Sequence, residues 1–247
     1  MKNICIQLFQ RIKYTKAFIK TLLVFLVISL STLISGVAQM NEYKLDEFLG
    51  SVDTCTMFNT IIIITFISVT LGSEFKNKTI YYSIMNGHTR KEVFLGKLIG
   101  FFPYIILLSL LQCVIMYSVL AFMTNDIFFD QYINNVILNS IAVTVVYISY
   151  SVLSLTFSFI SRSAIGGIGG SIIVIIVFNV IFFLLNLTGA NFFSYELSNF
   201  FGMFIFRYLL ENNADIVFQI IAILVYIILS GTYLCIGYNR FKKDDLI

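Results

Sequence analysis

Residue types that could perform chemistry are sparse in this chain and widely separated. Its one histidine, His88, stands alone beside a turn signal, where we expect a solvated side chain and no metal. The four cysteines are Cys5, Cys55, Cys113 and Cys235. They follow no C-x-x-C spacing, and Cys113 and Cys235 lie inside apolar runs, so the pattern indicates neither a zinc site nor a disulfide framework. We therefore expect this chain to bind no metal or cofactor of its own.

The long apolar stretches of the chain contain no Asp, Glu or His. General acid–base chemistry at membrane depth needs such groups, so the sequence does not predict an intramembrane protease, a lipid transferase or any other enzyme. The same absence argues against a proton-coupled transporter. Two alternatives stay open. One is a sodium-coupled secondary transporter, whose marker would be inverted repeats with broken helices, and the other is a non-transporting structural subunit of the membrane.

The composition of the chain indicates which secondary-structure elements hold its polar residues in place. The 247-residue chain is 59% hydrophobic and only 12% charged, whereas a soluble domain carries roughly 25% charged residues. Apolar stretches that each reach the ~20 residues needed to cross hydrocarbon as a helix recur along the chain. They lie near residues 17–38, 54–72, 98–123, 133–160, 164–187 and 216–238. We predict an all-α membrane protein, one transmembrane domain over residues 1–247 with six transmembrane helices.

The distribution of charge predicts the orientation of these helices. With the N-terminus inside the cell, 14 of the 16 basic residues are cytoplasmic, and only Lys44 and Arg207 are external. The fourteen are Lys2, Arg11, Lys13, Lys16, Lys20, Lys76, Lys78, Arg90, Lys91, Lys97, Arg162, Arg240, Lys242 and Lys243. Cytoplasmic segments of membrane proteins carry such an excess of Lys and Arg. Both termini are therefore predicted to be cytoplasmic.

The first cytoplasmic segment, residues 2–14, has the pattern of an amphipathic helix. Its apolar side chains share one arc and its charged and amide side chains take the other side. The apolar arc consists of Ile4, Cys5, Leu8, Phe9 and Ile12. This pattern predicts an interfacial helix that lies on the lipid of the inner leaflet before the first span. A disordered basic tail is the alternative.

The cytoplasmic loop between the second and third spans, residues 72–97, reads as two helical pieces. Asn86-Gly87 is a turn signal between them, and Thr89 and Glu92 have the spacing of a capping box that starts the next helix. The first piece presents Phe75, Tyr81, Tyr82 and Ile84 among Lys76, Asn77 and Lys78. A mixed basic and aromatic surface suits docking onto another protein, and an ordinary loop helix that lies on lipid is the alternative.

The amino-acid sequence of this loop resembles that of a known protein family. The run G-S-E-F-K-N-K-T-I, followed by N-G-H-T-R-K-E-V-F-L-G-K, resembles the second-to-third-span loop of permease subunits of type 2 ABC exporters. The ending G-Y-N-R-F-K-K-D-D is similar to the short tail of these subunits. The six-span layout and the N-terminal helix agree with the family over the whole chain. Members of this class move drugs, antibiotics, antimicrobial peptides, lipids or glycans, and its small stand-alone permeases often serve self-protection.

The resemblance implies a function and a set of partners. The chain would be the membrane permease of an exporter for an amphipathic substrate, in the bacterial cytoplasmic membrane. Two copies of a separate ABC ATPase would bind ATP and Mg, a second permease would complete a homodimer or heterodimer, and no nucleic acid would be involved. The loop helix would be the coupling helix that fits a groove of the ATPase. Its coupling residues would be Glu74, Phe75, Lys76, Asn77, Lys78, Thr79, Ile80, Tyr81, Tyr82 and Ile84.

An aromatic segment at residues 188–215 is external by the charge distribution. Polar residues interrupt it too often for a span, so it is expected to lie in the outer interface or to enter the membrane and return. The resembled family has short re-entrant helices here, between the last two spans, at the outer end of the pathway. Phe200 and Phe204 are on this ground candidates for the substrate path.

Hydroxyl side chains concentrate in the fourth apolar stretch. Tyr147, Tyr150, Ser151 and Ser154 form its most polar section and are further candidates for a substrate-facing wall. Serine and tyrosine hydroxyls in membrane helices also hydrogen-bond neighbouring helices. Both interpretations stay open at the level of sequence.

Overall fold

The computed structural model describes residues 2–38, 45–123, 136–187, 191–192, 195–196 and 216–243. Almost all of these residues are helical. The helices are α1 (Lys2–Thr15), α2 (Ala17–Ala38), α3 (Leu45–Lys76), α4 (Thr79–Met85), α5 (Arg90–Met123), α7 (Val136–Ser161), α8 (Ala164–Leu187) and α10 (Ile216–Lys243). A two-residue antiparallel pair, β1 (Asn191–Phe192) with β2 (Tyr195–Glu196), follows α8. The predicted all-helical fold is confirmed.

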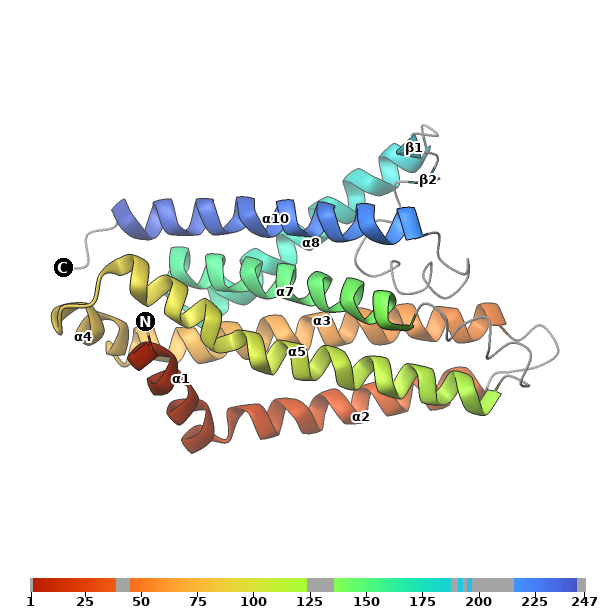
Figure 1. The fold of residues 1–247 in the computed structure, drawn as a ribbon, viewed down its shortest axis with the longest axis horizontal. Helices are drawn as coiled ribbons and strands as arrows, with labels where there is room; N and C mark the ends of the chain where they lie inside the picture. Colours follow the sequence, from red (N-terminus) through yellow and green to blue (C-terminus); the bar gives the residue numbers. More distant parts are fainter. Residues whose placement is uncertain are drawn as a thin grey trace.

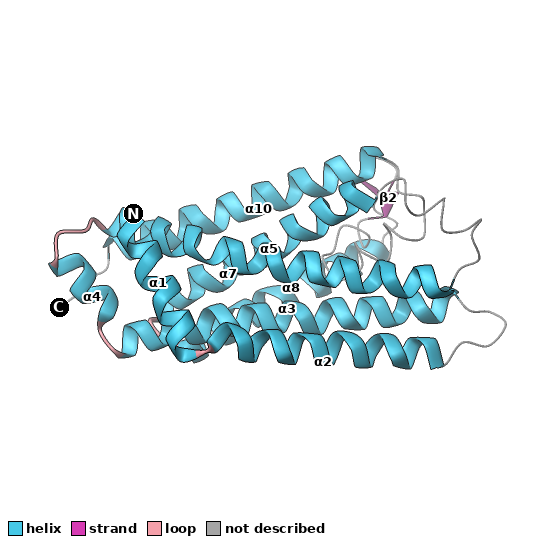
Figure 2. Ribbon diagram, turned by 60° about the horizontal axis from the view of Figure 1, so that its bottom comes forward, coloured by secondary structure: helices cyan, strands magenta, loops and turns pink. Residues whose placement is uncertain are grey.

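Consecutive long helices run up and down the same bundle (Figure 1). In both views, α1, α4 and the C-terminal end of α10 lie at one end of it (Figures 1 and 2). The start of α5 and the α7–α8 turn reach the same end. We call this the basic end, because all fourteen basic residues predicted to be cytoplasmic lie on these elements or on the adjoining turns of α2 and α3.

Five helices are long and apolar enough to cross a membrane by length and composition. The qualifying stretches are Ala17–Ile34, Gly50–Lys76, Arg90–Val119, Val136–Ser161 and Val217–Lys243. The remaining long helix, α8, is 24 residues long, and Ala164–Phe178 is an apolar stretch within it. The protein is therefore a multi-pass membrane protein. Helices occupy all six predicted stretches, and five of them qualify as spans.

The helix that contains the second predicted span is longer than that span. The stretch 54–72 is part of α3, which runs from Leu45 to Lys76, whereas the helix that contains 98–123 begins at Arg90, next to its predicted capping box. A helix keeps its hydrogen bonds beyond the hydrocarbon when nothing breaks it, and hydrophobicity alone cannot detect that extension. In consequence Asp53 and Glu74 lie inside α3, and the expectation of apolar helices free of carboxylates is wrong for this helix.

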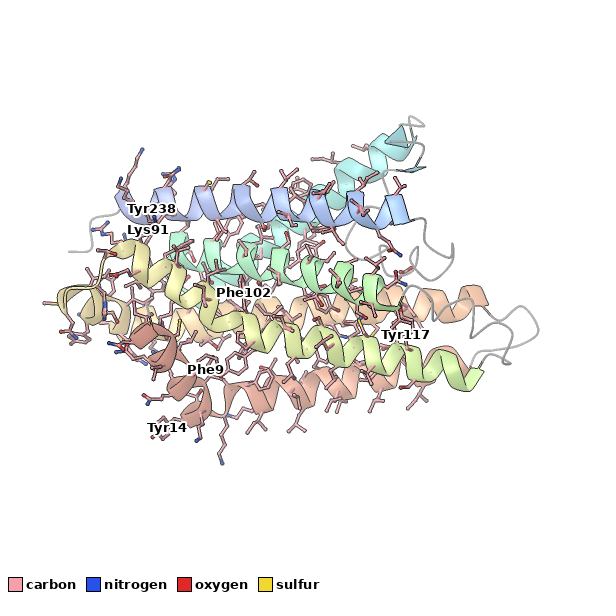
Figure 3. All side chains as sticks on the ribbon, in the orientation of Figure 1. Phe9, Tyr14, Lys91, Phe102, Tyr117 and Tyr238 are labelled. Carbon is pink, nitrogen blue, oxygen red and sulfur yellow. The ribbon has the colours of Figure 1, made fainter. Side chains whose placement is uncertain are left out.

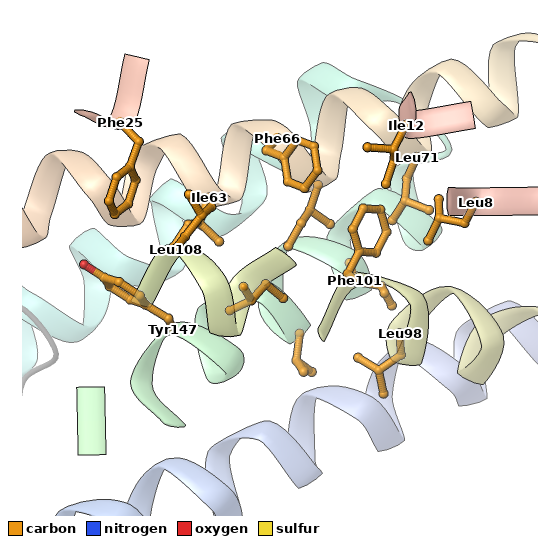
Figure 4. Close-up of a cluster of buried hydrophobic side chains, with 14 of the residues drawn as sticks. Leu8, Ile12, Phe25, Ile63, Phe66, Leu71, Leu98, Phe101, Leu108 and Tyr147 are labelled. Carbon is orange, nitrogen blue, oxygen red and sulfur yellow. The ribbon is translucent and has the colours of Figure 1, made fainter. Parts of the chain in front are cut away.

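The largest apolar cluster lies between α1, α3, α5 and α7. Figure 4 shows part of it, with Phe66 and Phe101 beside Leu8 and Ile12. The ring centroids of Phe66 and Phe101 are 5.8 Å apart in an edge-to-face arrangement, which aromatic pairs prefer. A second cluster joins α7, α8 and α10 around Tyr150 and the buried side chain of Phe218. The core is thus built by helix-to-helix packing along the bundle.

The packing of α1 corrects its predicted environment. Ile4, Leu8 and Ile12 are at most 1% exposed, and a Cβ placed on Gly100 of α5 would lie 2.6 Å from Leu8. Three side chains of the apolar arc therefore face the protein, where the sequence predicted contact with lipid, while Phe9 of the same arc is 38% exposed. Tyr14 is 84% exposed and projects away from the bundle (Figure 3). The helical pattern of residues 2–14 was right, but amphipathicity does not distinguish lipid from protein as the apolar partner.

Buried amides connect the helices in the middle of the bundle. Asn59 Nδ2 of α3 donates to Ser29 Oγ of α2 at 2.9 Å and to Gln112 Oε1 of α5 at 3.0 Å. The hydroxyl of Tyr147 on α7 donates to the same Gln112 oxygen. Polar side chains inside a membrane protein must find partners within it. Such interhelical bonds contribute about 0.6–2 kcal/mol each. The cluster therefore stabilises the packing of α2, α3, α5 and α7.

Candidate functional site

A short helix with well-defined ends connects α3 to α5 at the basic end. The chain leaves α3 through Lys78, which has a left-handed φ of 57°, and enters α4 at Thr79. At the other end Gly87 has φ of 90°. The N–H of Gly87 donates to Ile84 O at 3.0 Å and that of His88 to Ser83 O at 3.3 Å. This is a Schellman motif, which glycine favours, and the predicted turn at Asn86-Gly87 is confirmed.

A capping box begins α5 directly after this turn. The backbone N–H of Thr89 donates to Glu92 Oε2 at 2.9 Å, and the N–H of Glu92 donates to Thr89 Oγ1 at 3.2 Å. The two side chains thereby satisfy donors that the first turn of a helix leaves unpaired. The predicted start of the helix at Thr89 is confirmed. Turns of fixed geometry therefore bound α4 on both sides.

A buried ion pair lies beneath α4. Lys97 Nζ of α5 is 2.8 Å from Glu74 Oε1 of α3, and the side chains are 5% and 2% exposed. Arg11 of α1 reaches the same oxygen at 3.8 Å. A charge this far from water is tolerated when it is paired. Glu74 therefore holds the ends of three helices together by charge.

Arg11 extends this contact to α4. Its Nη1 donates to Thr79 Oγ1 at 2.9 Å and its Nη2 to Ser73 Oγ at 3.1 Å. The Thr79 hydroxyl in turn donates to the backbone carbonyl of Glu74 at 3.0 Å. Because guanidinium is planar and always charged, it fixes the direction of the groups it binds. The first residue of α4 is thus connected to both α1 and α3.

Aromatic rings fill the space between α4 and the bundle. Phe75 contacts Tyr81 of α4 and Phe159 of α7, with ring centroids 6.4 Å and 5.4 Å away. Phe159 in turn packs against Phe94 of α5 at 5.0 Å and Phe241 of α10 at 4.8 Å. Edge-to-face pairs of this kind stabilise by about 0.5–1.5 kcal/mol beyond their buried area. One ring cluster therefore joins α4 to α3, α5, α7 and α10.

The loop and the C-terminal segment that carry the resemblance meet in space. Arg90 of the loop donates to Phe241 O at 3.0 Å and to Lys242 O at 2.8 Å. These are carbonyls at the end of α10, which lack partners within the helix and are well satisfied by a cation. Tyr238 packs on Phe94 with centroids 6.2 Å apart, and Figure 3 shows Tyr238 and Lys91 at this end. The loop and the C-terminal segment therefore pack against each other.

The predicted coupling residues divide into a buried and an exposed group. Lys76, Asn77, Lys78, Thr79 and Tyr82 are exposed, Tyr81 and Ile84 are half-buried, and Glu74, Phe75 and Ile80 are buried. The prediction that Phe75 belongs to the presented aromatic surface is wrong, because it is 5% exposed in the ring cluster. Tyr82 is 58% exposed and Met85 is 80% exposed. These two supply the apolar part of the open face of α4.

The predicted substrate-path residues on α7 make contacts within the bundle. Tyr147 donates to Gln112, and Ser154 Oγ lies 2.8 Å from Ser68 Oγ and donates to a backbone carbonyl of α3. Ser151 donates to Ile148 O of its own helix at 2.6 Å. The contacts between helices favour helix packing over a substrate-facing wall for Tyr147 and Ser154.

Tyr150 is the candidate on α7 that borders a cavity. The cavity has a volume of about 30 Å³ and also adjoins Tyr226 of α10, whose ring centroid is 6.1 Å from that of Tyr150. A space of this size holds about one water molecule. Phe200 and Phe204, like most of the segment 188–215, lie outside the described residues.

Arg11 and Lys97 are the site residues that sequence reasoning missed. A signal for Lys97 was present, because Glu74 ends one apolar stretch and Lys97 begins the next. Two consecutive antiparallel helices bring such ends together, so opposite charges there predict an ion pair. Arg11 carried no comparable signal, since it lies 63 positions before Glu74 (74 − 11). Its contact depends on how α1 turns back onto α5.

A scan against protein-family models finds no match, and a search of curated proteins finds none with significant similarity.

Proposed function

We propose that this chain is the membrane permease subunit of a type 2 ABC exporter, of the bacterial class that exports drugs and antimicrobial peptides or confers immunity to them. The proposal rests on the resemblance of the loop and the tail. The observation that carries it furthest is the arrangement of α4. A short helix between two long membrane helices is fixed to the bundle on one side and open on the other.

The two sides of α4 suit a coupling role. On the inner side, Ile80 and Ser83 are buried, and the Arg11 and Phe75 contacts connect the helix to the ends of α1, α3 and α5. On the outer side, Tyr82 and Met85 are exposed, with basic side chains nearby. A partner that moves α4 would therefore move the ends of the membrane helices with it. The ATPase would bind the outer side and drive this movement.

The charge distribution supports the orientation that this role needs. A coupling helix must face the cytoplasm, where ATP is available, and the basic end is cytoplasmic under the positive-inside rule. We propose six spans, with α8 as the fifth, and both termini in the cytoplasm. The membrane would be the bacterial cytoplasmic membrane. The segment 188–215 would then be external, as interfacial or re-entrant structure that contains Phe200 and Phe204.

The proposed complex has four subunits. Two ATPases would bind and hydrolyse ATP with Mg, and a second permease, identical or different, would complete the membrane part. This chain would supply no catalytic residue and would bind neither cofactor nor nucleic acid. The substrate would be amphipathic, such as a toxic peptide or a membrane-active antibiotic that the cell must remove.

The test is whether the gene beside this one encodes an ABC ATPase, and whether that ATPase associates with this chain. The two proteins should co-purify, and the complex should hydrolyse ATP faster when substrate is added. In the double variant Tyr82→Ala/Met85→Ala, we expect complex yield to fall by at least ten-fold. The physical reason is that a short docking helix concentrates affinity in a few exposed anchors worth ~2 kcal/mol or more each.

The matched control is Tyr14→Ala, which removes an exposed aromatic side chain at the same end but on α1. Its complex yield should equal that of the wild type. Equal yields for the α4 double variant and the wild type would contradict the assignment of α4. Failure of the wild-type pair to associate at all would contradict the exporter proposal.

A further inference from the structure

A groove lies where α1 turns into α2 and both approach α3. Its volume is about 380 Å³, which is roughly a dozen times the ~30 Å³ of a water molecule. Arg11, Thr15 and Lys20 line it from α1 and α2, and Phe66 and Val69 line it from α3. It is open on one side to the surroundings of the bundle. We call it the α1–α3 groove.

On α3 the lining of the groove has Ser73 and Thr70 toward the basic end and Val69 and Phe66 deeper in the bundle. The deepest lining residue, Thr65, bonds its hydroxyl to Ile61 O of its own helix. The contributing residues of α3 begin at Thr65 and end at Ser73, a rise of about 12 Å at 1.5 Å per residue. Val69 is 50% exposed although it is apolar, as is usual for a side chain that faces lipid. A molecule with a polar head and an apolar body matches this arrangement.

The charges at the groove favour an anionic head. Arg11 and Lys20 both line it, and Lys13 and Lys16 are exposed on the same helix and at its end. The one acidic side chain in contact with Arg11 is Glu74, among the described residues, and Lys97 already pairs with Glu74 at 2.8 Å. No ion pair in the described part of the chain includes Lys20. The groove therefore carries a positive charge that the described residues do not neutralise.

Arg11 is prepared to bind an anion. Its bonds to Ser73 and Thr79 use one hydrogen on each of two nitrogens, and guanidinium has five N–H donors in a fixed plane. Three donors therefore remain, held in a defined direction before any ligand arrives. Guanidinium geometry suits phosphate, and the ammonium of Lys20 on its long stem can reach the interface as a second point charge.

We infer that the α1–α3 groove binds an anionic phospholipid from the leaflet at the basic end. The phosphodiester lies between Arg11 and Lys20, and the first part of an acyl chain lies over Phe66 and Val69. The site does not include the exposed face of α4, although Arg11 also donates to Thr79, the first residue of that helix. Its occupant connects α1 to α2 and α3, so the lipid stabilises the position of the N-terminal helix.

The test uses the purified full-length chain in detergent, with phosphatidylglycerol titrated and bound lipid counted by native mass spectrometry. We expect one phosphatidylglycerol to be retained, and phosphatidylcholine, which is zwitterionic, to be retained more weakly. Lys20→Gln should weaken retention about five-fold, the effect of one basic residue at an anionic lipid surface. Lys13→Gln removes the same charge from an exposed position outside the groove lining and should leave retention unchanged.

A second variant tests the apolar part of the groove without altering charge. Val69→Trp fills the space over α3 from an exposed position and should also displace phosphatidylglycerol. Equal losses for Lys20→Gln and Lys13→Gln would mean unspecific attraction to a basic surface and would overturn the proposal. Displacement of the lipid by inorganic phosphate at equal concentration would indicate a free-anion site, which also contradicts it. If Val69→Trp separates a dimer of this chain and leaves lipid retention intact, the groove is a contact between copies.

Discussion

Glu74 carries a charge into a part of the protein that water does not reach. Its side chain is 2% exposed, and its Oε2 atom is buried without a hydrogen-bond partner among the described residues. The carboxylate thus depends on Lys97 and Arg11, which both contact the other oxygen. A buried ion pair adds little net stability over an apolar pair of similar size, but loss of one partner is severe.

This asymmetry predicts the behaviour of single and double variants. Lys97→Met or Glu74→Leu alone should lower the free energy of unfolding by about 3–5 kcal/mol, since each leaves a buried charge without its main partner. The double variant Glu74→Leu/Lys97→Met should recover most of that loss. Thermal unfolding in detergent measures the difference. Additive losses in the double variant would show that the two charges do not act as a pair.

At the scale of elements, α3 and α8 approach each other through glycine. A Cβ placed on Gly72 would lie 2.6 Å from the Cα of Ala164, the first residue of α8. Backbone cannot rotate away as a side chain can, so any side chain at this position must separate the two helices. Small residues permit such contact between membrane helices. The start of α8 is therefore positioned by the absence of a side chain on α3.

We predict that Gly72→Ala destabilises the protein by about 1–3 kcal/mol, the usual cost of adding volume to a packed contact. Gly50→Ala is the control, because Gly50 is in the same helix and a Cβ there would meet none of the described residues within 4 Å. That substitution should be neutral or stabilising by up to ~1 kcal/mol, since alanine favours helix over glycine. A shared direction of change in melting temperature for the two variants would argue against the packing explanation.

At the scale of the whole molecule, sequence predicted the helices well and their contacts poorly. The bilayer permits long apolar helices and little else, so their number and approximate positions follow from hydrophobicity. The C-terminal end of α4 and the start of α5 were predictable, because Gly87 and the Thr89–Glu92 capping box are local signals. The extension of α3 to Leu45 had no such signal.

For the candidate site too, local sequence signals predicted some features, whereas contacts between residues distant in sequence could not be predicted. That residues 79–85 form a helix could be predicted, but the burial of Phe75 could not, because its partner Phe159 is distant in sequence. The same holds for Tyr147, whose hydroxyl could equally have faced a substrate until the position of Gln112 was known. Contacts between helices depend on how each helix is rotated, and a pattern of apolar residues restricts that rotation only loosely.

The proposed coupling role of α4 requires one orientation of the molecule in the membrane, in which the basic end faces the cytoplasm. Cysteine labelling in intact cells measures it directly. The four native cysteines are replaced first, because Cys235 is exposed and Cys5 half-buried. Single cysteines then replace Lys78 and Lys243 at the basic end, and Lys44 and Glu211 outside the described residues. Each is treated with a membrane-impermeant maleimide before and after permeabilisation.

We predict that cysteines at positions 44 and 211 react in intact cells, and that those at 78 and 243 react only after permeabilisation. The reason is that fourteen basic residues at one end fix that end in the cytoplasm. Labelling of position 78 in intact cells would place α4 outside, where no ATPase could reach it, and would contradict both the orientation and the proposed coupling.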